Sequence, residues 1–279
     1  MQHGKASRTA LRVAIRRAAH QLVDDPPVLV DPVAVKLIGQ DYPRDLERAS
    51  HTVARDFRAY LAARSRFAED HLVKAIAAGV RQYVILGAGL DTFAYRNPFP
   101  DLRVFEADFP ATQDAKREML AAAGIALPPN LTFVPLDFEH KTLLESLFDA
   151  GINQSAPAFF SWLGVAPYLT IQAFRSTLAA IGTLPEGTGV AFDYSLPPET
   201  LTPERRAIFD RLAERVAAAG EPFQLFFTPE QMDNELRQAG FRRIEQLDHE
   251  GLNQLYFQNR ADGLKLSPVR IGIVVAAWK

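Results

Sequence analysis

The sequence contains no cysteine, which excludes disulfide bonds, a thiol nucleophile and a cysteine-ligated zinc site. Histidine is scarce as well: the chain has six, and their spacing matches no metal-ligand pattern. We therefore expect no metal site. A chain without cysteine suits a reducing compartment, and we expect a cytoplasmic protein.

An excess of positive charge is also lacking, because 31 Lys and Arg stand against 33 Asp and Glu and the formal net charge is −2. Nucleic-acid-binding proteins usually carry a basic excess, so we expect no nucleic-acid partner. The longest apolar runs, near 158–166 and 271–278, are far shorter than the ~20 residues of a membrane-spanning helix, so no membrane partner is expected either. A chain of 279 residues with 48% hydrophobic content has the composition of a globular protein.

The first 80 residues predict helices over about 6–22, 31–39 and 51–78. Residues 1–23 are basic and contain no acid, as transit peptides do, but their apolar residues recur at helical spacing. We interpret them as an amphipathic helix of the folded protein. Residues 1–78 are expected to form a helical cover on an α/β core of residues 79–279, and the whole chain, 1–279, to be a single domain.

Short apolar segments alternate with helical stretches from residue 81 onward. The predicted strands lie at 83–86, 102–105, 131–136, 158–162 and 189–192, and the predicted helices at 111–123, 140–149, 171–182 and 203–219. This alternation is typical of a parallel sheet wrapped by helices. Two last strands, 241–247 and 269–278, show no helix-length pattern between them, so we expect them to pair antiparallel. The predicted fold is a Rossmann-like α/β fold whose seven-stranded sheet has an antiparallel last strand.

The strongest chemical motif is Gly87-Ala88-Gly89, which follows a buried strand and precedes a helix. The first glycine permits a tight turn, and the second lets a ligand approach the backbone where a Cβ atom would collide. A dinucleotide fingerprint requires a third glycine at position 92, where this chain has Thr92. The motif therefore favours a nucleoside ligand smaller than a dinucleotide.

Acidic residues follow the next two predicted strands. Glu106 and Asp108 lie about 20 residues after the glycines and point to one face of their strand, where one of them can accept hydrogen bonds from a ribose diol. Asp137 can accept from an adenine amine and Phe138 can cover its ring. Asp137 has an alternative interpretation as the cap of the following helix.

Five segments carry a family pattern: Ala63-Arg64-Ser65-Arg66-Phe67, and residues 86–92, 104–110, 134–139 and 159–169. In this order they resemble the class I S-adenosylmethionine-dependent methyltransferases, and more narrowly the leucine carboxyl methyltransferase superfamily with its bacterial O-methyltransferase branch. Residues 6–10 and 191–194 also fit, so the resemblance covers nearly the whole chain. It implies the methyltransferase fold, S-adenosyl-L-methionine as cofactor and a small-molecule acceptor as partner; no particular oligomeric state is implied.

The resemblance also implies residue roles. Arg64 would pair with the methionine carboxylate of the cofactor, and Gly87, Ala88 and Gly89 would pass beneath its amino-acid part. Asp108 would hold the ribose hydroxyls. Asp137 and Phe138 would hold the adenine. Many relatives have an acid where this chain has Leu163, so at this position only the backbone could contact the cofactor.

The acceptor side is predicted around Pro167 and Tyr168. A basic N-terminal helix with Arg8, Arg12 and Arg16 is expected to form a lid, and the segment 220–228 a second wall. We expect the acceptor to be a carboxylate, which is already ionised at neutral pH. A phenol, the alternative, would need a general base.

No motif supplies such a base, so no catalytic residue is assigned. His140 is expected on the wrong side of the cofactor, whereas His20 and His51 remain candidates to face the pocket. Two other classes stay open at this point: a nicotinamide-dependent oxidoreductase, which Thr92 disfavours, and a non-catalytic nucleoside-binding module, which the fold alone does not distinguish from an enzyme.

Overall fold

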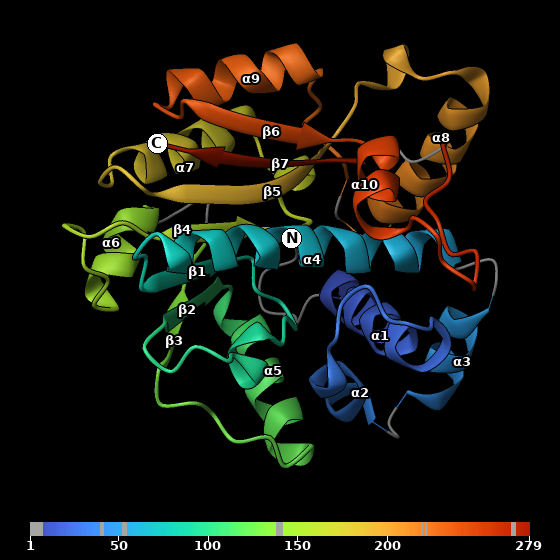
Figure 1. Ribbon diagram of the computed structural model, residues 1–279, viewed down its shortest axis with the longest axis horizontal. Coiled ribbons are helices and arrows are strands. Elements are labelled where there is room, and N and C mark those ends of the chain that lie inside the picture. The colour runs from blue at the N-terminus through green and yellow to red at the C-terminus, as the bar shows by residue number, and fades with distance from the viewer. Residues whose placement is uncertain are drawn as a thin grey trace.

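The architecture is a twisted sheet with helices on both faces and a separate group of helices at one corner (Figure 1). It is taken from a computed structural model that describes residues 8–39, 42–51, 55–137, 142–218, 220, 222–268 and 272–279. The helices at the corner are α1 (Arg8–Val23), α2 (Pro32–Ile38) and α3 (Pro43–Ser50). Among the described residues no helix is long and apolar enough to cross a membrane.

The sheet contains seven strands in the order β3-β2-β1-β4-β5-β7-β6. They are β1 (Gln82–Leu86), β2 (Arg103–Asp108), β3 (Leu131–Pro135), β4 (Phe159–Trp162), β5 (Gly189–Ser195), β6 (Arg243–Leu247) and β7 (Gly272–Trp278). The first five run parallel, and β7 is antiparallel to both of its neighbours, β5 and β6. The predicted seven-stranded sheet with an antiparallel last strand is therefore confirmed.

Two apolar layers cover the sheet. The first contains α6 (Leu143–Asp149), α7 (Ile171–Gly182) and α9 (Pro229–Gln238), which pack on Val84, Phe160 and Phe192. The second contains α4 (Arg55–Ala77) and α10 (His249–Tyr256), which pack on Tyr83, Ile85 and neighbouring strand residues of the opposite face. The remaining helices are α5 (Pro110–Ala122) and α8 (Pro203–Ala218).

The sequence analysis missed three helices. It treated the stretch between the last two strands as free of helix, but α10 lies there and returns the chain so that β7 enters antiparallel. Helices α3 and α9 were not predicted either.

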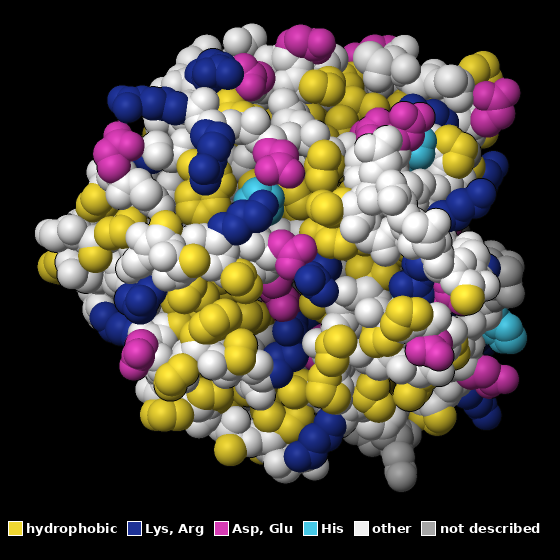
Figure 2. Space-filling view, in the orientation of Figure 1, with side chains coloured by type: hydrophobic (Ala, Val, Ile, Leu, Met, Phe, Trp, Pro, Cys, Tyr) yellow, Lys and Arg dark blue, Asp and Glu magenta, His cyan; other side chains and the backbone are white. Residues whose placement is uncertain are grey.

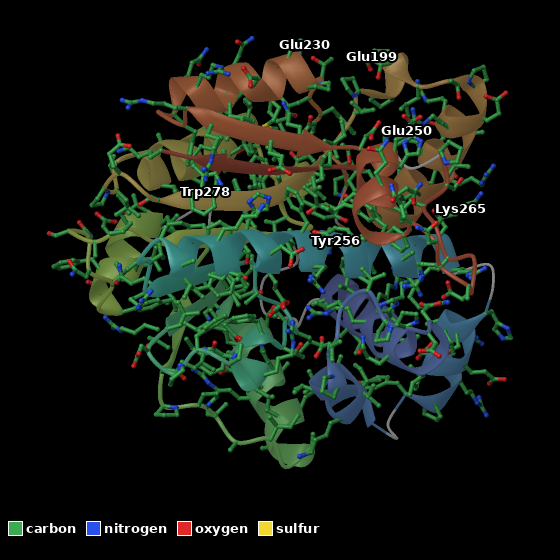
Figure 3. The ribbon with its side chains drawn as sticks, viewed as in Figure 1. Glu199, Glu230, Glu250, Tyr256, Lys265 and Trp278 are labelled. Carbon is green, nitrogen blue, oxygen red and sulfur yellow. The ribbon has the colours of Figure 1, made fainter. Side chains whose placement is uncertain are left out.

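Two contacts hold the last elements of the chain in place (Figure 3). Tyr256, at the end of α10, donates to Asp70 of α4 across 2.9 Å. Trp278 of β7 packs against Phe159 of β4.

A buried polar cluster joins α1 to α4. Asp24 accepts hydrogen bonds from Arg58 Nε at 2.7 Å and from Arg58 Nη2 at 2.8 Å. His20 accepts the Val28 N–H at Nε2, 2.8 Å away, so its Nδ1 carries the proton that it donates to Asp24. Burial works to raise the pKa of Asp24, but the hydrogen bonds from Arg58 and His20 lower that pKa to about 2.

We expect Asp24→Asn to destabilise the protein by about 3 kcal/mol at pH 7, because it removes the charge that compensates the buried Arg58. The folded-state pKa of Asp24 lies below its ordinary value, so this carboxylate stabilises the fold above about pH 5 and loses that contribution as the pH falls through about 2. Denaturant unfolding at pH 7, 4 and 3 should show that the difference in unfolding free energy between Asp24→Asn and wild type shrinks as the pH falls. Asp101→Asn, at an exposed position, is the control; a pH-independent difference would contradict the assignment.

Candidate functional site

A cavity lies at the carboxyl ends of β1, β2 and β4, where parallel strands of this kind present ligands. Its lining combines the turn after β1, the end of β2, the segments after β3 and β4, the middle of α4, the first part of α1 and a loop after α8. The ionisable side chains among the lining residues are Arg17, Arg64, Asp91, Asp108, Asp137 and Tyr168. The outer surface on the side shown in Figure 2 carries charges of both signs scattered among apolar side chains, with no strip of one sign.

The glycine turn after β1 forms part of the cavity floor. Gly87 and Gly89 both have positive φ, at 63° and 49°, a backbone conformation that favours glycine. A Cβ atom at Gly87 would collide with the side chain of Val165, and one at Gly89 would lie 2.9 Å from the Cβ of Ala10. The predicted motif residues, Ala88 included, all line the cavity, and only glycine fits at the two flanking positions.

The two acids of β2 have separate surroundings. Asp108 lines the cavity and accepts the backbone N–H groups of Gly89 at 2.5 Å and Phe109 at 2.7 Å. Glu106 is buried and pairs with Lys116 of α5 at 2.6 Å. Burial raises the pKa of Asp108, and the two N–H groups oppose that rise. The structure thus separates a cavity acid, Asp108, from a structural one, Glu106.

Of the adenine candidates, Asp137 lines the cavity and is half-buried. It lies two residues beyond Pro135, the last residue of β3, which pairs with Asp108 of β2. Phe138 lies outside the residues that the structure describes, as does His140. Leu163 lines the cavity from the segment after β4 and packs its side chain against the α4 layer.

Arg64 reaches the cavity from the middle of α4. Its side chain is buried, and its Nη1 donates to Asp193 of β5 at 2.8 Å. Its Nε is also buried but has no hydrogen-bond partner. An unpartnered guanidinium N–H at a cavity wall is suited to an anionic ligand group.

Helix α1 forms one wall of the cavity through Thr9, Ala10, Val13, Ala14 and Arg17. The predicted lid arginines are not part of it: Arg12 is exposed, and Arg16 bonds back to the Arg12 carbonyl. The side chain of Arg8 lies outside the described part of the chain. Because α1 also buries Ile15, Ala18 and Ala19 against α2 and α3, it is a packed wall rather than a removable cover.

Sequence reasoning missed the interaction that holds α1 in place. Arg17 pairs with Asp91, after the glycine turn, at 2.6 Å and with Asp31, before α2, at 2.7 Å. Thr92 donates to the same Asp31 at 2.6 Å. Thr92, the residue that replaces a third glycine, therefore joins the turn to the helical cover.

The opposite wall consists of Gly220, Pro222 and Gln224, from the predicted segment 220–228, together with Tyr168. The Tyr168 ring stacks on Phe223 with centroids 5.3 Å apart. Pro167 does not line the cavity; its carbonyl accepts the N–H groups of Gln224 and Leu225 and so attaches this loop to the short helical turn Ala166–Tyr168 after β4.

No histidine among the described residues lines the cavity. His20 uses both ring nitrogens in the cluster with Asp24, and His51 is exposed after α3. Neither of these two candidates therefore faces the cavity. Within the described ranges there is also no group of three or more His, Cys, Asp or Glu side chains that could hold a metal ion.

Comparison with known proteins shows the family. The sequence profile of the leucine carboxyl methyltransferase family matches residues 10–182. The chain is 32% identical to the Bacillus subtilis protein named "Putative S-adenosyl-L-methionine-dependent methyltransferase YktD", with 95% of each sequence covered. It is 33% identical to a Mycobacterium avium protein named "Putative S-adenosyl-L-methionine-dependent methyltransferase", over 75% of this chain and 71% of that one.

Solved structures show the same fold. A Thermobifida fusca protein described as a "putative methyltransferase" superposes with a TM-score of 0.61 at 18% identity, covering 100% of this chain and 96% of the other. The family profile and the relatives favour a methyltransferase over the nicotinamide-dependent oxidoreductase. The chain belongs to the leucine carboxyl methyltransferase family and is an S-adenosylmethionine-dependent methyltransferase.

Proposed function

We propose that this methyltransferase transfers its methyl group to the carboxylate oxygen of a small acceptor. The observation that carries the proposal is the lining of the cavity, where the described residues include neither His nor Lys. A carboxylate, with a pKa of about 4, is already the nucleophile at neutral pH, whereas a phenol, with a pKa of about 10, must first lose a proton. A site without a suitable base favours the acceptor that needs none.

Two of the three cavity acids, Asp91 and Asp108, are poor bases for a phenol. Asp91 is held by Arg17, and although burial works to raise its pKa, Arg17 and other nearby cations lower that pKa to about 2. Asp108 accepts two backbone N–H groups and belongs to the ribose side of the site. This leaves positioning of the two reactants as the main contribution that the protein makes to the rate.

The residues that line the cavity suit one orientation of the cofactor. Asp108 and Asp137, at the ends of β2 and β3, would hold the ribose and the adenine. Gly87 and Gly89 line the floor on which the amino-acid part would lie, and the guanidinium of Arg64 would pair with its carboxylate. Two arginines and three aspartates line the described cavity, which suits a ligand with a net positive charge. S-adenosylmethionine supplies an electrophilic methyl group on its sulfonium.

The acceptor would then lie on the β4 side, between α1 and the loop 222–224. The wall there is apolar: Val13, Leu163, Val165, Tyr168 and Pro222. Tyr168 is backed by an aromatic group in which Phe223 stacks on Phe209 and Phe209 contacts Phe226 edge-on. Because this wall buries apolar surface, we propose that the acceptor has an apolar body beside its carboxylate.

Asp108→Ala is expected to weaken binding of S-adenosylhomocysteine by roughly 1–3 kcal/mol, which is about 5- to 150-fold, since a buried hydrogen-bond acceptor is lost. Isothermal titration calorimetry measures the change. Asp114→Asn, at an exposed position on α5, should bind like wild type. Unchanged affinity in both Asp108→Ala and Arg64→Ala would refute the placement of the cofactor.

Incubation with methyl-labelled S-adenosylmethionine and a panel of small carboxylic acids and phenols tests the acceptor class. The expected product is a methyl ester, from which mild base releases labelled methanol. A base-stable aryl ether as the product would show that a phenol is the acceptor and that the protein supplies a base.

Tyr168→Ala should raise the KM for apolar acids about tenfold and leave the affinity for S-adenosylhomocysteine within twofold of wild type, because the ring lies on the acceptor side. Tyr168→Phe keeps the stacked ring and should behave like wild type in both assays. If Tyr168→Phe instead abolished turnover with acids that wild type accepts, the hydroxyl would be part of the chemistry and the proposal of a base-free site would be wrong.

A further inference from the structure

Asp193 lies at the carboxyl end of β5, beside the cavity but outside its lining. The two oxygens of this buried carboxylate have different partners. Oδ2 accepts from Arg64 Nη1 at 2.8 Å and from the Tyr60 hydroxyl at 3.3 Å. Oδ1 accepts the backbone N–H of Gly164 at 2.5 Å. One carboxylate therefore connects α4, β5 and the segment after β4.

We infer that Asp193 is a positioning residue for cofactor binding: it fixes the guanidinium of Arg64 so that its remaining donors meet the methionine carboxylate. This inference rests on the role proposed for Arg64. Asp193 takes Nη1, whereas Nε and Nη2 have no hydrogen-bond partner among the described residues, and a guanidinium that lines a cavity binds a carboxylate through charge-assisted hydrogen bonds.

Close packing around Gly164 supports this assignment. Gly164 has a φ of +69°, and a Cβ atom there would lie 2.8 Å from Arg64 Nη2 and 2.9 Å from Nη1. The guanidinium is thus held between a glycine backbone and the Asp193 carboxylate. Since Oδ1 also holds the Gly164 N–H, the same residue fixes the start of the segment that carries Val165 and Tyr168 into the cavity.

A competing effect predicts the opposite result. A carboxylate paired with Arg64 neutralises part of its charge and could weaken its attraction for a second carboxylate. If that effect dominated, removing the charge at Asp193 would strengthen cofactor binding. If Asp193 acts by positioning, removing it would weaken binding, and only for ligands that carry the amino-acid part.

The test is calorimetric titration of two ligands, S-adenosylhomocysteine and 5′-methylthioadenosine, which lacks the amino-acid carboxylate. Asp193→Asn should weaken S-adenosylhomocysteine about tenfold and leave 5′-methylthioadenosine within twofold of wild type. Tyr60→Phe, which keeps the carboxylate and removes the hydroxyl that contacts it at 3.3 Å, is the control and should bind both ligands like wild type. Asp193→Glu keeps the charge but displaces it by one methylene, and should show a smaller loss with the same selectivity.

An equal loss for both ligands would mean a general structural role, and unchanged or tighter binding of S-adenosylhomocysteine would mean that positioning is absent; each result overturns the inference. If Asp193→Asn does not fold, Asp193→Glu decides in the same way.

Arg64→Gln is titrated in parallel. If it binds S-adenosylhomocysteine like wild type, the role of Arg64 fails and the inference with it. If only Arg64→Gln loses affinity, the role of Arg64 stands and the positioning role of Asp193 fails. The ester assay is independent of both outcomes.

Discussion

The hydrogen bond from the Gly89 N–H to the Asp108 carboxylate, 2.5 Å long, is the interaction on which the site depends. It ties the turn after β1 to the end of the neighbouring strand, so the backbone floor of the cavity and the acid beside it form one unit. The turn can adopt this shape only because Gly87 and Gly89 tolerate positive φ and carry no Cβ. Helix α1 and the segment after β4 both pack against this turn, through Ala10 and Val165.

The helical cover is attached through charge. Arg17 of α1 is buried between Asp91 and Asp31, and Asp31 also caps α2 by accepting the Ala34 N–H. Buried ion pairs of this kind contribute little net stability, since desolvation offsets much of the Coulomb attraction. They do select one arrangement of the groups that they join, because any other would leave a buried charge without a partner. Helix α1 is thereby held against the glycine turn, with Ala10 next to Gly89.

Local patterns were sufficient to predict the sheet and the glycine turn. A strand, a G-x-G turn and a helix are set by neighbours in the sequence, and the positive φ values follow from the glycines themselves. The choice between Glu106 and Asp108 could not be made locally, because residues two apart on a strand share a face. It depended on Lys116, one helix further along, which neutralises Glu106 in the core. Helix α10 escaped notice because it has only eight residues and includes a glycine.

Contacts between distant segments account for the rest. Arg64 and Asp193 are 129 residues apart, and Arg17 and Asp91 are 74 apart, so no spacing rule links them. For His20, the structure removes a role that the sequence allowed. A helical histidine near a predicted pocket is a reasonable candidate base, but only the folded chain shows that the Val28 N–H and Asp24 occupy both of its nitrogens. The family resemblance supplied the role of Arg64, whereas the geometry supplied its partner.

The most direct test of this account is an experimental structure of the complex with S-adenosylhomocysteine. We predict that the ribose hydroxyls bond to Asp108, that the amino-acid carboxylate meets Arg64 while Arg64 keeps its contact with Asp193, and that the sulfur faces the wall formed by Val13 and Tyr168. A complex in which the sulfur points away from Tyr168, or in which the amino-acid part lies far from Arg64, would contradict it.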